Sequence, residues 1–468
     1  MEPCTRRTFI STASAASAGL LWLTRPAMAA VTPPATARAS SRGLASAIAP
    51  FAIEDNKLVV PTGTYHIGQG RAVQVTTTAQ LAVEPADIVT VRDEELHLSA
   101  DKPGGFFTGT KLAGTLASSI GAFGSLIEDS VSLRDPSGLP LRRGEDFLIS
   151  APFALLGLAP HSRVKSTDTV FASYAFYRQR IDLVAVDASG IPLLVPGTPH
   201  IATPSIPTLP ADSAAIATVY RPFGARSLDA AHVFPIISTA REAVTATTRG
   251  RVPKTLAKLR RGDPVTVVCW GDSITVGADV AQGDAWANRF RTALLSRFPK
   301  AALTFRNHSI GGSKSVQWLN NGEFGDLPKK DPEKCRFEHV VSGNPDLIVM
   351  EFLNDIVFSE DVLERTYKAI HDAFTARGIE WIIVTPSQKI PSNSNLAEMK
   401  ATEVRPLDSF LRRFADLHGH ALADTAARWS HLHREGIPYF ALFANAYNHP
   451  NAFGHGLFVE EILTCLEG

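Results

Sequence analysis

The pattern of apolar and polar residues changes once along the chain, at about residue 263. Before that point, short apolar runs with frequent alternation are separated by turn clusters rich in Gly, Pro, Asp and Ser. Alternation places every second side chain on one face of a strand, so the pattern predicts β-strands. The expected strands cover residues 58–60, 80–83, 96–98, 131–133, 181–186 and 211–220. We therefore expect a β-rich, sandwich-like domain over residues 43–236.

After residue 263, apolar runs alternate with amphipathic segments. Trp286, Phe290, Leu294 and Phe298 recur at every fourth position, which is the spacing of one helix face. The apolar runs at 265–270, 302–307, 347–352, 381–385 and 421–424 are typical of buried strands. This alternation predicts an α/β domain with a parallel sheet over residues 263–468, joined to the β-rich domain by a connector at 237–262.

Four polar clusters follow predicted strands or precede the last predicted helix. They are residues 271–273 (Gly-Asp-Ser), 307–313 (Asn-His-Ser-Ile-Gly-Gly-Ser), 354–355 (Asn-Asp) and 448–451 (Asn-His-Pro-Asn). The carboxyl ends of parallel strands meet at one edge of a sheet, where ligands bind in open α/β folds. We therefore expect these clusters to form one site.

In order, spacing and flanking strands, the four clusters resemble the SGNH, or GDSL-type, hydrolase family over about residues 263–468. The resemblance implies a flavodoxin-like, three-layer fold and a serine hydrolase. It implies Ser273 as nucleophile and His449 as catalytic base. It also implies an oxyanion hole formed by the backbone N–H groups of Ser273 and Gly312 and by the side-chain amide of Asn354.

The same residue types fit the chemistry of acyl transfer. A serine hydroxyl is a weak nucleophile until an imidazole accepts its proton. The negative charge of the tetrahedral intermediate needs hydrogen-bond donors. We expect Asp272, Asp355 and Asn448 to support the site from behind, without contacting substrate.

One part of the family pattern is missing. The family's acid stands three residues before the histidine, at the position of Ala446, and no carboxylate lies between Gly436 and Glu460. Two alternatives remain open at this point. The side-chain oxygen of Asn445 orients the imidazole, or a Ser–His dyad is supported by a backbone carbonyl.

The N-terminus predicts export. The pair Arg6-Arg7, then Phe9, precedes a stretch of small and apolar residues at 11–23, and Ala27-Met-Ala29 is a small-x-small cleavage site. This arrangement is typical of a secretory signal peptide, here residues 1–30, and it resembles a twin-arginine signal. Residues 31–42 are rich in Pro, Ala, Ser and Thr, which is typical of a linker. We expect a periplasmic or extracellular protein.

Composition narrows the possible partners. The chain has 46 Lys and Arg against 46 Asp and Glu, so zero net charge favours neither nucleic acid nor an anionic membrane as partner. No apolar run after the signal is long enough for a membrane span. Beyond the signal, the cysteines are Cys269, Cys335 and Cys465, an odd number with no zinc-site spacing. We expect no metal and no cofactor.

The leading functional hypothesis is an exported serine esterase that removes O-acetyl or other small acyl groups from carbohydrate. One alternative is an esterase or lipase acting on longer acyl chains or other esters. Another is a glycan-binding or glycan-remodelling protein whose site has drifted, which the alanine at position 446 motivates.

Overall fold

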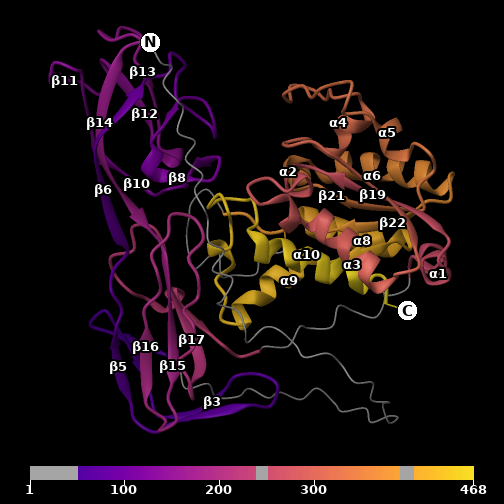
Figure 1. Ribbon diagram of the computed structural model, residues 1–468, viewed down its shortest axis with the longest axis horizontal. Helices are drawn as coiled ribbons and strands as arrows, with labels where there is room; N and C mark the ends of the chain where they lie inside the picture. The colour runs from indigo at the N-terminus through magenta and orange to yellow at the C-terminus, as the bar shows by residue number, and fades with distance from the viewer. Residues whose placement is uncertain (1–50, 239–250, 391–404, 468) are drawn as a thin grey trace, which may run out of the picture.

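The computed structural model of the 468-residue chain describes residues 51–238, 251–390 and 405–467 (Figure 1). The predicted signal peptide and linker, residues 1–30 and 31–42, lie outside the described residues and remain predictions. The predicted division at 237–262 also remains a prediction. In the structure, the last antiparallel strand ends at Pro235, and helix α1 (Pro253–Arg261) precedes the parallel sheet.

The C-terminal part contains one five-stranded, fully parallel sheet, which confirms the predicted α/β fold. Its order is β20-β19-β21-β22-β23, so the second strand of the domain lies outside the first. The strands are β19 (Pro264–Gly271), β20 (Ala302–Ser309), β21 (Leu347–Glu351), β22 (Glu380–Val384) and β23 (Ala421–Ala423). In this order the chain reverses direction across the sheet between β19 and β21, which is where such folds bind ligands.

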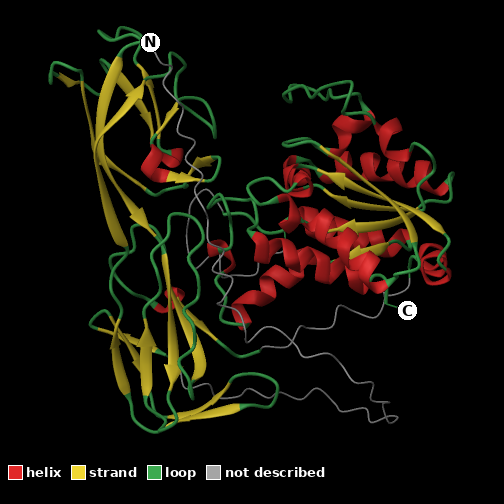
Figure 2. Ribbon diagram, in the orientation of Figure 1, coloured by secondary structure: helices red, strands yellow, loops and turns green. Residues whose placement is uncertain are grey.

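Helices cover both faces of this sheet, so its strands are buried on both sides (Figure 2). Along β19, Val267 and Cys269 belong to the core on one face, while Val268 and Trp270 belong to the core on the other. The first face packs against α3 (Trp286–Arg297) and α10 (Ala452–Thr464). The second packs against α4 (Ser315–Leu319), α5 (Phe337–Val341), α6 (Glu360–Thr375) and α8 (Pro406–His418).

The N-terminal part is β-rich, as predicted, but it has two hydrophobic cores. The first core includes Leu58 and Val83 from early in the chain and Val184 and Ile236 from its end. It lies between the sheets β1-β2-β5 and β16-β15-β17-β18. Their strands, with the hairpin β3-β4, are β1 (Ala52–Glu54), β2 (Lys57–Val60), β3 (Gly63–His66), β4 (Ala72–Val75), β5 (Ala79–Ala82), β15 (Arg180–Val186), β16 (Pro192–Val195), β17 (Ala214–Arg221) and β18 (Val233–Pro235).

The second core is built from residues that lie between those two stretches in the sequence, so it is inserted into the first β unit. The sheets β11-β10-β14-β6 and β12-β13-β7 enclose it. The strands, with the small hairpin β8-β9, are β6 (Asp87–His97), β7 (Thr110–Lys111), β8 (Leu116–Ala117), β9 (Ile120–Gly121), β10 (Leu126–Arg134), β11 (Pro140–Leu141), β12 (Phe147–Ser150), β13 (Leu155–Leu158) and β14 (Thr169–Arg178). Figure 1 shows the two units end to end beside the α/β part.

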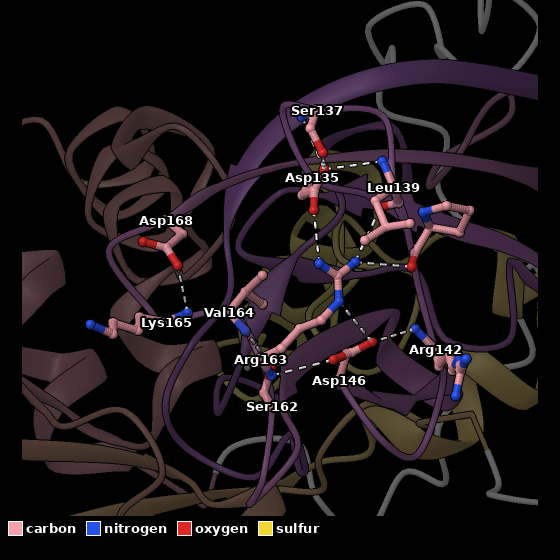
Figure 3. A network of polar contacts seen from close by, with 11 residues as sticks. Asp135, Ser137, Leu139, Arg142, Asp146, Ser162, Arg163, Val164, Lys165 and Asp168 are labelled. Atoms are coloured by element: carbon pink, nitrogen blue, oxygen red, sulfur yellow. Dashed lines mark hydrogen bonds and ion pairs between the residues drawn. The ribbon is translucent and has the colours of Figure 1, made fainter.

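A polar network holds the turns at the edge of the inserted unit (Figure 3). Arg163 donates to Asp135 at 2.8 Å and forms an ion pair with Asp146 at 3.6 Å. Asp135 also accepts hydrogen bonds from Ser137, and their hydroxyl contact measures 2.6 Å. Every partner in this network belongs to the β-rich part, so we assign it a role in fixing loops rather than in catalysis.

The first β unit packs directly against the α/β part. Phe234 and Tyr220 share one buried cluster with Trp429 and Phe440. The buried Thr218 hydroxyl donates to the carbonyl of Gly436 at 2.5 Å. This junction lies just before the loop that carries His449, so the β-rich part supports one side of the predicted site.

Ser359 occupies the N-cap position of α6, but its side chain makes no capping hydrogen bond. Among the described residues, no helix combines the length and apolar character needed to cross a bilayer.

Candidate active site

Ser273 lies at the carboxyl end of β19, where the strand turns into the short helix α2 (Ser273–Val276). Asp272 caps this helix, since its Oδ1 accepts the N–H of Ile274 at 3.0 Å. The turn requires a glycine at 271, because a Cβ there would lie 2.1 Å from the Thr275 hydroxyl and 2.3 Å from the Glu351 carbonyl. The tight corner leaves Ser273 partly exposed above a buried strand.

His449 reaches Ser273 from a loop far along the chain. The Ser273 hydroxyl lies 2.9 Å from His449 Nε2, within hydrogen-bond distance. The loop is held by Asn445, whose Oδ1 accepts the backbone N–H groups of Tyr447, Asn448 and His449. The structure therefore brings together the two residues on which the sequence prediction depended most.

The second imidazole nitrogen faces a carboxylate that the sequence analysis missed. His449 Nδ1 lies 2.5 Å from Asp279 Oδ2, and the Asp279 side chain is only 5% exposed. Burial alone would raise the pKa of Asp279, but hydrogen bonds from His449 and Ser118 outweigh it and lower the pKa to about 2. The carboxylate is thus ionised at neutral pH and can hold the imidazole in one tautomer.

This contact corrects the prediction that Asn445 orients the imidazole. Asn445 Oδ1 is occupied by three backbone N–H groups, and its Nδ2 donates to Asn448 Oδ1 at 3.0 Å. Asn445 and Asn448 therefore shape the histidine loop, while Asp279 contacts the ring. The alternative of a dyad supported by a backbone carbonyl also fails, because a side-chain carboxylate occupies that place.

Ala446 cannot be exchanged simply for the family's acid. It is 1% exposed, has a φ of +54°, and packs in a cluster with Ala117, Ala122 and Ala202 of the β-rich part. A carboxylate at this position would be buried among methyl groups, at a high desolvation cost.

Asp279 and His449 are 170 positions apart, so the sequence around the histidine gives no sign of this acid. It lies beyond α2, after Gly277, which ends that helix with a φ of +80°. Asp279 itself has a φ of +66°. A glycine two positions before an aspartate, at the end of a helix, is the available sequence signal, but it is weak, because such turns are common.

The residues expected to form the oxyanion hole lie around the nucleophile. Gly312 has a φ of +70°, and a Cβ on the preceding Gly311 would lie 3.8 Å from Ser273 Cβ, so this loop passes beside the serine. Asn354, in the 3-10 turn η6 (Leu353–Val357), donates its side-chain amide to Asp272 Oδ2 at 2.8 Å. That bond uses one of the two amide hydrogens and leaves the second for a ligand.

Three buried carboxyl groups lie behind the nucleophile. Asp272 accepts from the backbone and side chain of Asn354, and Asp355 accepts from Ser315 and from the Tyr367 hydroxyl. Burial raises the pKa of Asp272 and of Asp355 to about 6 each, and it raises the pKa of Glu351 well above its ordinary value. Their hydrogen bonds run to neighbouring elements, so they hold the loops of the site in place.

Residues 269–457 match the model of the GDSL-like Lipase/Acylhydrolase family. No curated protein sequence matches the chain.

Several solved structures are similar to part of this chain. A two-domain esterase active on acetylated mannans, co-crystallized with mannopentaose, is 19% identical at a TM-score of 0.36, with 46% of this chain and 52% of that chain covered. The match thus spans about half of that esterase. An acetyl xylan esterase is 20% identical at a TM-score of 0.32, covering 42% of this chain and 98% of its own. A lipolytic protein of the G-D-S-L family from Veillonella parvula is 19% identical at a TM-score of 0.30, with 42% of this chain and 96% of that chain covered.

The family model covers the end of β19, the turn that carries Ser273, the loop that carries His449 and the elements between them. It confirms the resemblance found in the sequence: over residues 269–457, the chain folds as a domain of the GDSL-like lipase/acylhydrolase family.

Proposed function

We propose that this protein is an exported serine esterase that removes O-acetyl or other small acyl groups from carbohydrate. One observation carries the catalytic part of the proposal. A serine hydroxyl, an imidazole and an ionised carboxylate are linked by contacts of 2.9 Å and 2.5 Å at the ligand-binding edge of the sheet. Export rests on the signal-like N-terminus alone.

The mechanism has two half-reactions. Ser273 Oγ attacks the ester carbonyl while His449 Nε2 accepts its proton, and Asp279 stabilises the imidazolium through Nδ1. The resulting oxyanion is held by the N–H groups of Ser273 and Gly312 and by the free amide hydrogen of Asn354. The imidazolium then protonates the leaving alcohol. In the second half, His449 activates water, which releases the acid from the acyl-enzyme and restores Ser273.

Exposed aromatic rings near the site support carbohydrate as the substrate. Phe106 and Phe107 of the inserted β unit are 41% and 63% exposed. Phe106 lies 5.4 Å from the ring of Tyr447, which belongs to the histidine loop. Flat apolar rings beside a polar site suit a sugar, which has both apolar C–H faces and hydroxyl edges.

The first experiment compares Ser273→Ala with wild type in acetate release from p-nitrophenyl acetate. We expect loss of activity to the uncatalysed rate, with Ser296→Ala, an exposed serine of α3, as a control at wild-type rate. Wild-type turnover by Ser273→Ala would refute the serine-esterase proposal. A screen of acetate release from acetylated polysaccharides would then identify the sugar.

Both alternatives have direct tests. A series of p-nitrophenyl esters of increasing chain length separates a small-acyl esterase from a lipase, because only the latter should prefer long chains. The glycan-binding alternative was motivated by the missing acid at position 446, and Asp279 now supplies that carboxylate. A protein that binds glycans but whose Ser273 is not labelled by a fluorophosphonate would nevertheless favour the glycan-binding alternative.

A further inference from the structure

The β-rich part of the chain also binds the catalytic carboxylate, chiefly through the Ser118 hydroxyl and in addition through the Ser119 hydroxyl. The Ser118 hydroxyl donates to Asp279 Oδ1 at 2.7 Å, while Oδ2 of the same carboxylate faces His449. Ser118 and Asp279 are 161 positions apart in the sequence. Both oxygens of the carboxylate are therefore engaged, one by the imidazole and one by the other domain.

Ser118 occupies the tip of a tight hairpin. Strands β8 and β9 pair Leu116 with Gly121 and Ala117 with Ile120, which leaves Ser118 and Ser119 as the two turn residues. Ser118 has a φ of +57°, as two-residue hairpin turns require. Lys111 Nζ donates to the Ser119 carbonyl at 2.6 Å and braces the turn from β7.

The hairpin is packed against the histidine loop as well as against its own unit. Ala117 lies in a buried cluster with Ala446, and Ile120 lies in one with Phe153 and the partly buried Tyr447. A Cβ at Gly121 would lie 2.1 Å from the Phe153 carbonyl, so the hairpin sits close against the turn η2 (Ala151–Phe153). These contacts fix the position of the Ser118 hydroxyl relative to both His449 and Asp279.

We propose that Ser118 is a positioning residue for the catalytic acid, so that the β-rich domain completes the Ser273–His449–Asp279 triad. This inference rests on the proposed function. Asp279 lies in a turn after a helix of 4 residues, and a carboxylate bound through one oxygen alone can rotate about its side-chain bonds. The Ser118 hydroxyl opposes that rotation and keeps Oδ2 directed at the imidazole.

The test removes the hydroxyl in two ways in the full-length protein. Ser118→Ala deletes it, and Ser118→Gly deletes it while relieving the positive φ, so a fault in the turn would spare the glycine variant. We expect both to lower kcat for p-nitrophenyl acetate by about 3- to 10-fold, as loss of one exposed hydrogen bond to a charged group implies, with KM unchanged. Ser189→Ala, at an exposed turn of the first β unit, is the matched control and should keep the wild-type kcat.

The pH profile separates positioning from a purely structural role. Because the Ser118 hydrogen bond lowers the pKa of Asp279, its loss makes the carboxylate more basic. A more basic carboxylate stabilises the imidazolium, so the acidic limb of kcat/KM should move to higher pH in both variants. A purely structural role would lower the melting temperature and leave this limb in place.

A double-mutant cycle completes the test. In an Asp279→Ala background, Ser118→Ala should lower kcat no further, because its partner is gone. If both Ser118 variants keep the wild-type kcat and pH profile while Ser273→Ala is inactive, this inference is overturned and the esterase proposal stands. If Ser273→Ala stays fully active, the proposed function itself fails.

Discussion

At the scale of single residues, the site depends on how one carboxylate is held. Asp279 makes a 2.5 Å contact with His449 and a 2.7 Å contact with Ser118. Its role as triad acid is our proposal, and it differs from the family pattern, in which the acid stands three residues before the histidine. The imidazole needs an anion at Nδ1, and the part of the chain that supplies it is chemically irrelevant.

Replacing that acid should impair catalysis more than binding. In Asp279→Asn the neutral amide no longer stabilises the imidazolium, so we expect kcat to fall by about 10²–10⁴-fold with little change in KM. Steady-state kinetics with p-nitrophenyl acetate measure both constants. Asp263→Asn, just before β19 and with its side chain 42% exposed, serves as the control. A wild-type kcat in Asp279→Asn would exclude Asp279 as the acid.

The same residue predicts a pH dependence of stability. The pKa of Asp279 is lowered to about 2, below its unfolded value, so its ionised form stabilises the fold above about pH 4. This contribution, roughly 2 kcal/mol, should be lost as the pH falls from 4 towards 2. Urea denaturation of wild type and Asp279→Asn between pH 5 and pH 2.5 should show the gap between their unfolding free energies narrowing on acidification. A gap that widens would contradict the assignment.

At the scale of elements, the turn after α2 decides where Asp279 lies. Gly277 ends the helix with a φ of +80°, and a Cβ there would lie 2.4 Å from Ala285 Cβ. Both the backbone conformation and the close approach therefore require glycine. The turn and the β8-β9 hairpin meet at the carboxylate, each supplied by a different part of the chain.

Gly277→Ala should consequently disturb both stability and rate. We expect a loss of about 1–3 kcal/mol in unfolding free energy from the strained φ and the clash. We also expect a lower kcat, because Asp279 moves with the turn. Gly283→Ala is the matched control, since a Cβ there meets nothing within 4 Å. Chemical denaturation and p-nitrophenyl acetate turnover provide the two measurements, and equal behaviour of the two variants would contradict the prediction.

At the scale of the whole molecule, both units of the β-rich part contact the elements that form the site. The β8-β9 hairpin reaches Asp279, and the cluster around Phe234 and Phe440 packs beneath the segment leading to the histidine loop. The inserted unit and the first unit thus approach the α/β part at different places. We infer that the relative position of the parts matters for rate.

Substitutions of two buried phenylalanines distinguish an effect on rate from a general loss of stability. Phe234→Ala creates a cavity at the junction, and Phe147→Ala creates one in the core of the inserted unit. Each should lower the free energy of unfolding by about 3–5 kcal/mol. Below the melting temperature of both variants, only Phe234→Ala should lower kcat, because only that cavity adjoins elements leading to His449. Melting curves and kinetics on both proteins test this, and an unchanged kcat in Phe234→Ala would count against it.

The local sequence was sufficient to predict the α/β fold and to single out Ser273 and His449, whose hydroxyl and imidazole lie 2.9 Å apart in the structure. The unbroken apolar run Val267, Val268, Cys269 and Trp270 indicates a strand covered on both faces, and such a run is a property of neighbouring residues. The Gly-Asp-Ser corner at 271–273 and the loop of His449 were recognisable for the same reason, because each is a short contiguous block.

Only the tertiary structure decided which group faces His449 Nδ1 and what holds that group. Asp279 occupies its place through a left-handed turn, and Ser118 reaches it from a hairpin of another domain. The insertion of one β unit into the other, which places that hairpin, likewise appears only when distant strands pair. Sequence periodicity reports which side of an element is buried, but a contact across many residues is fixed by the packing of whole elements against one another.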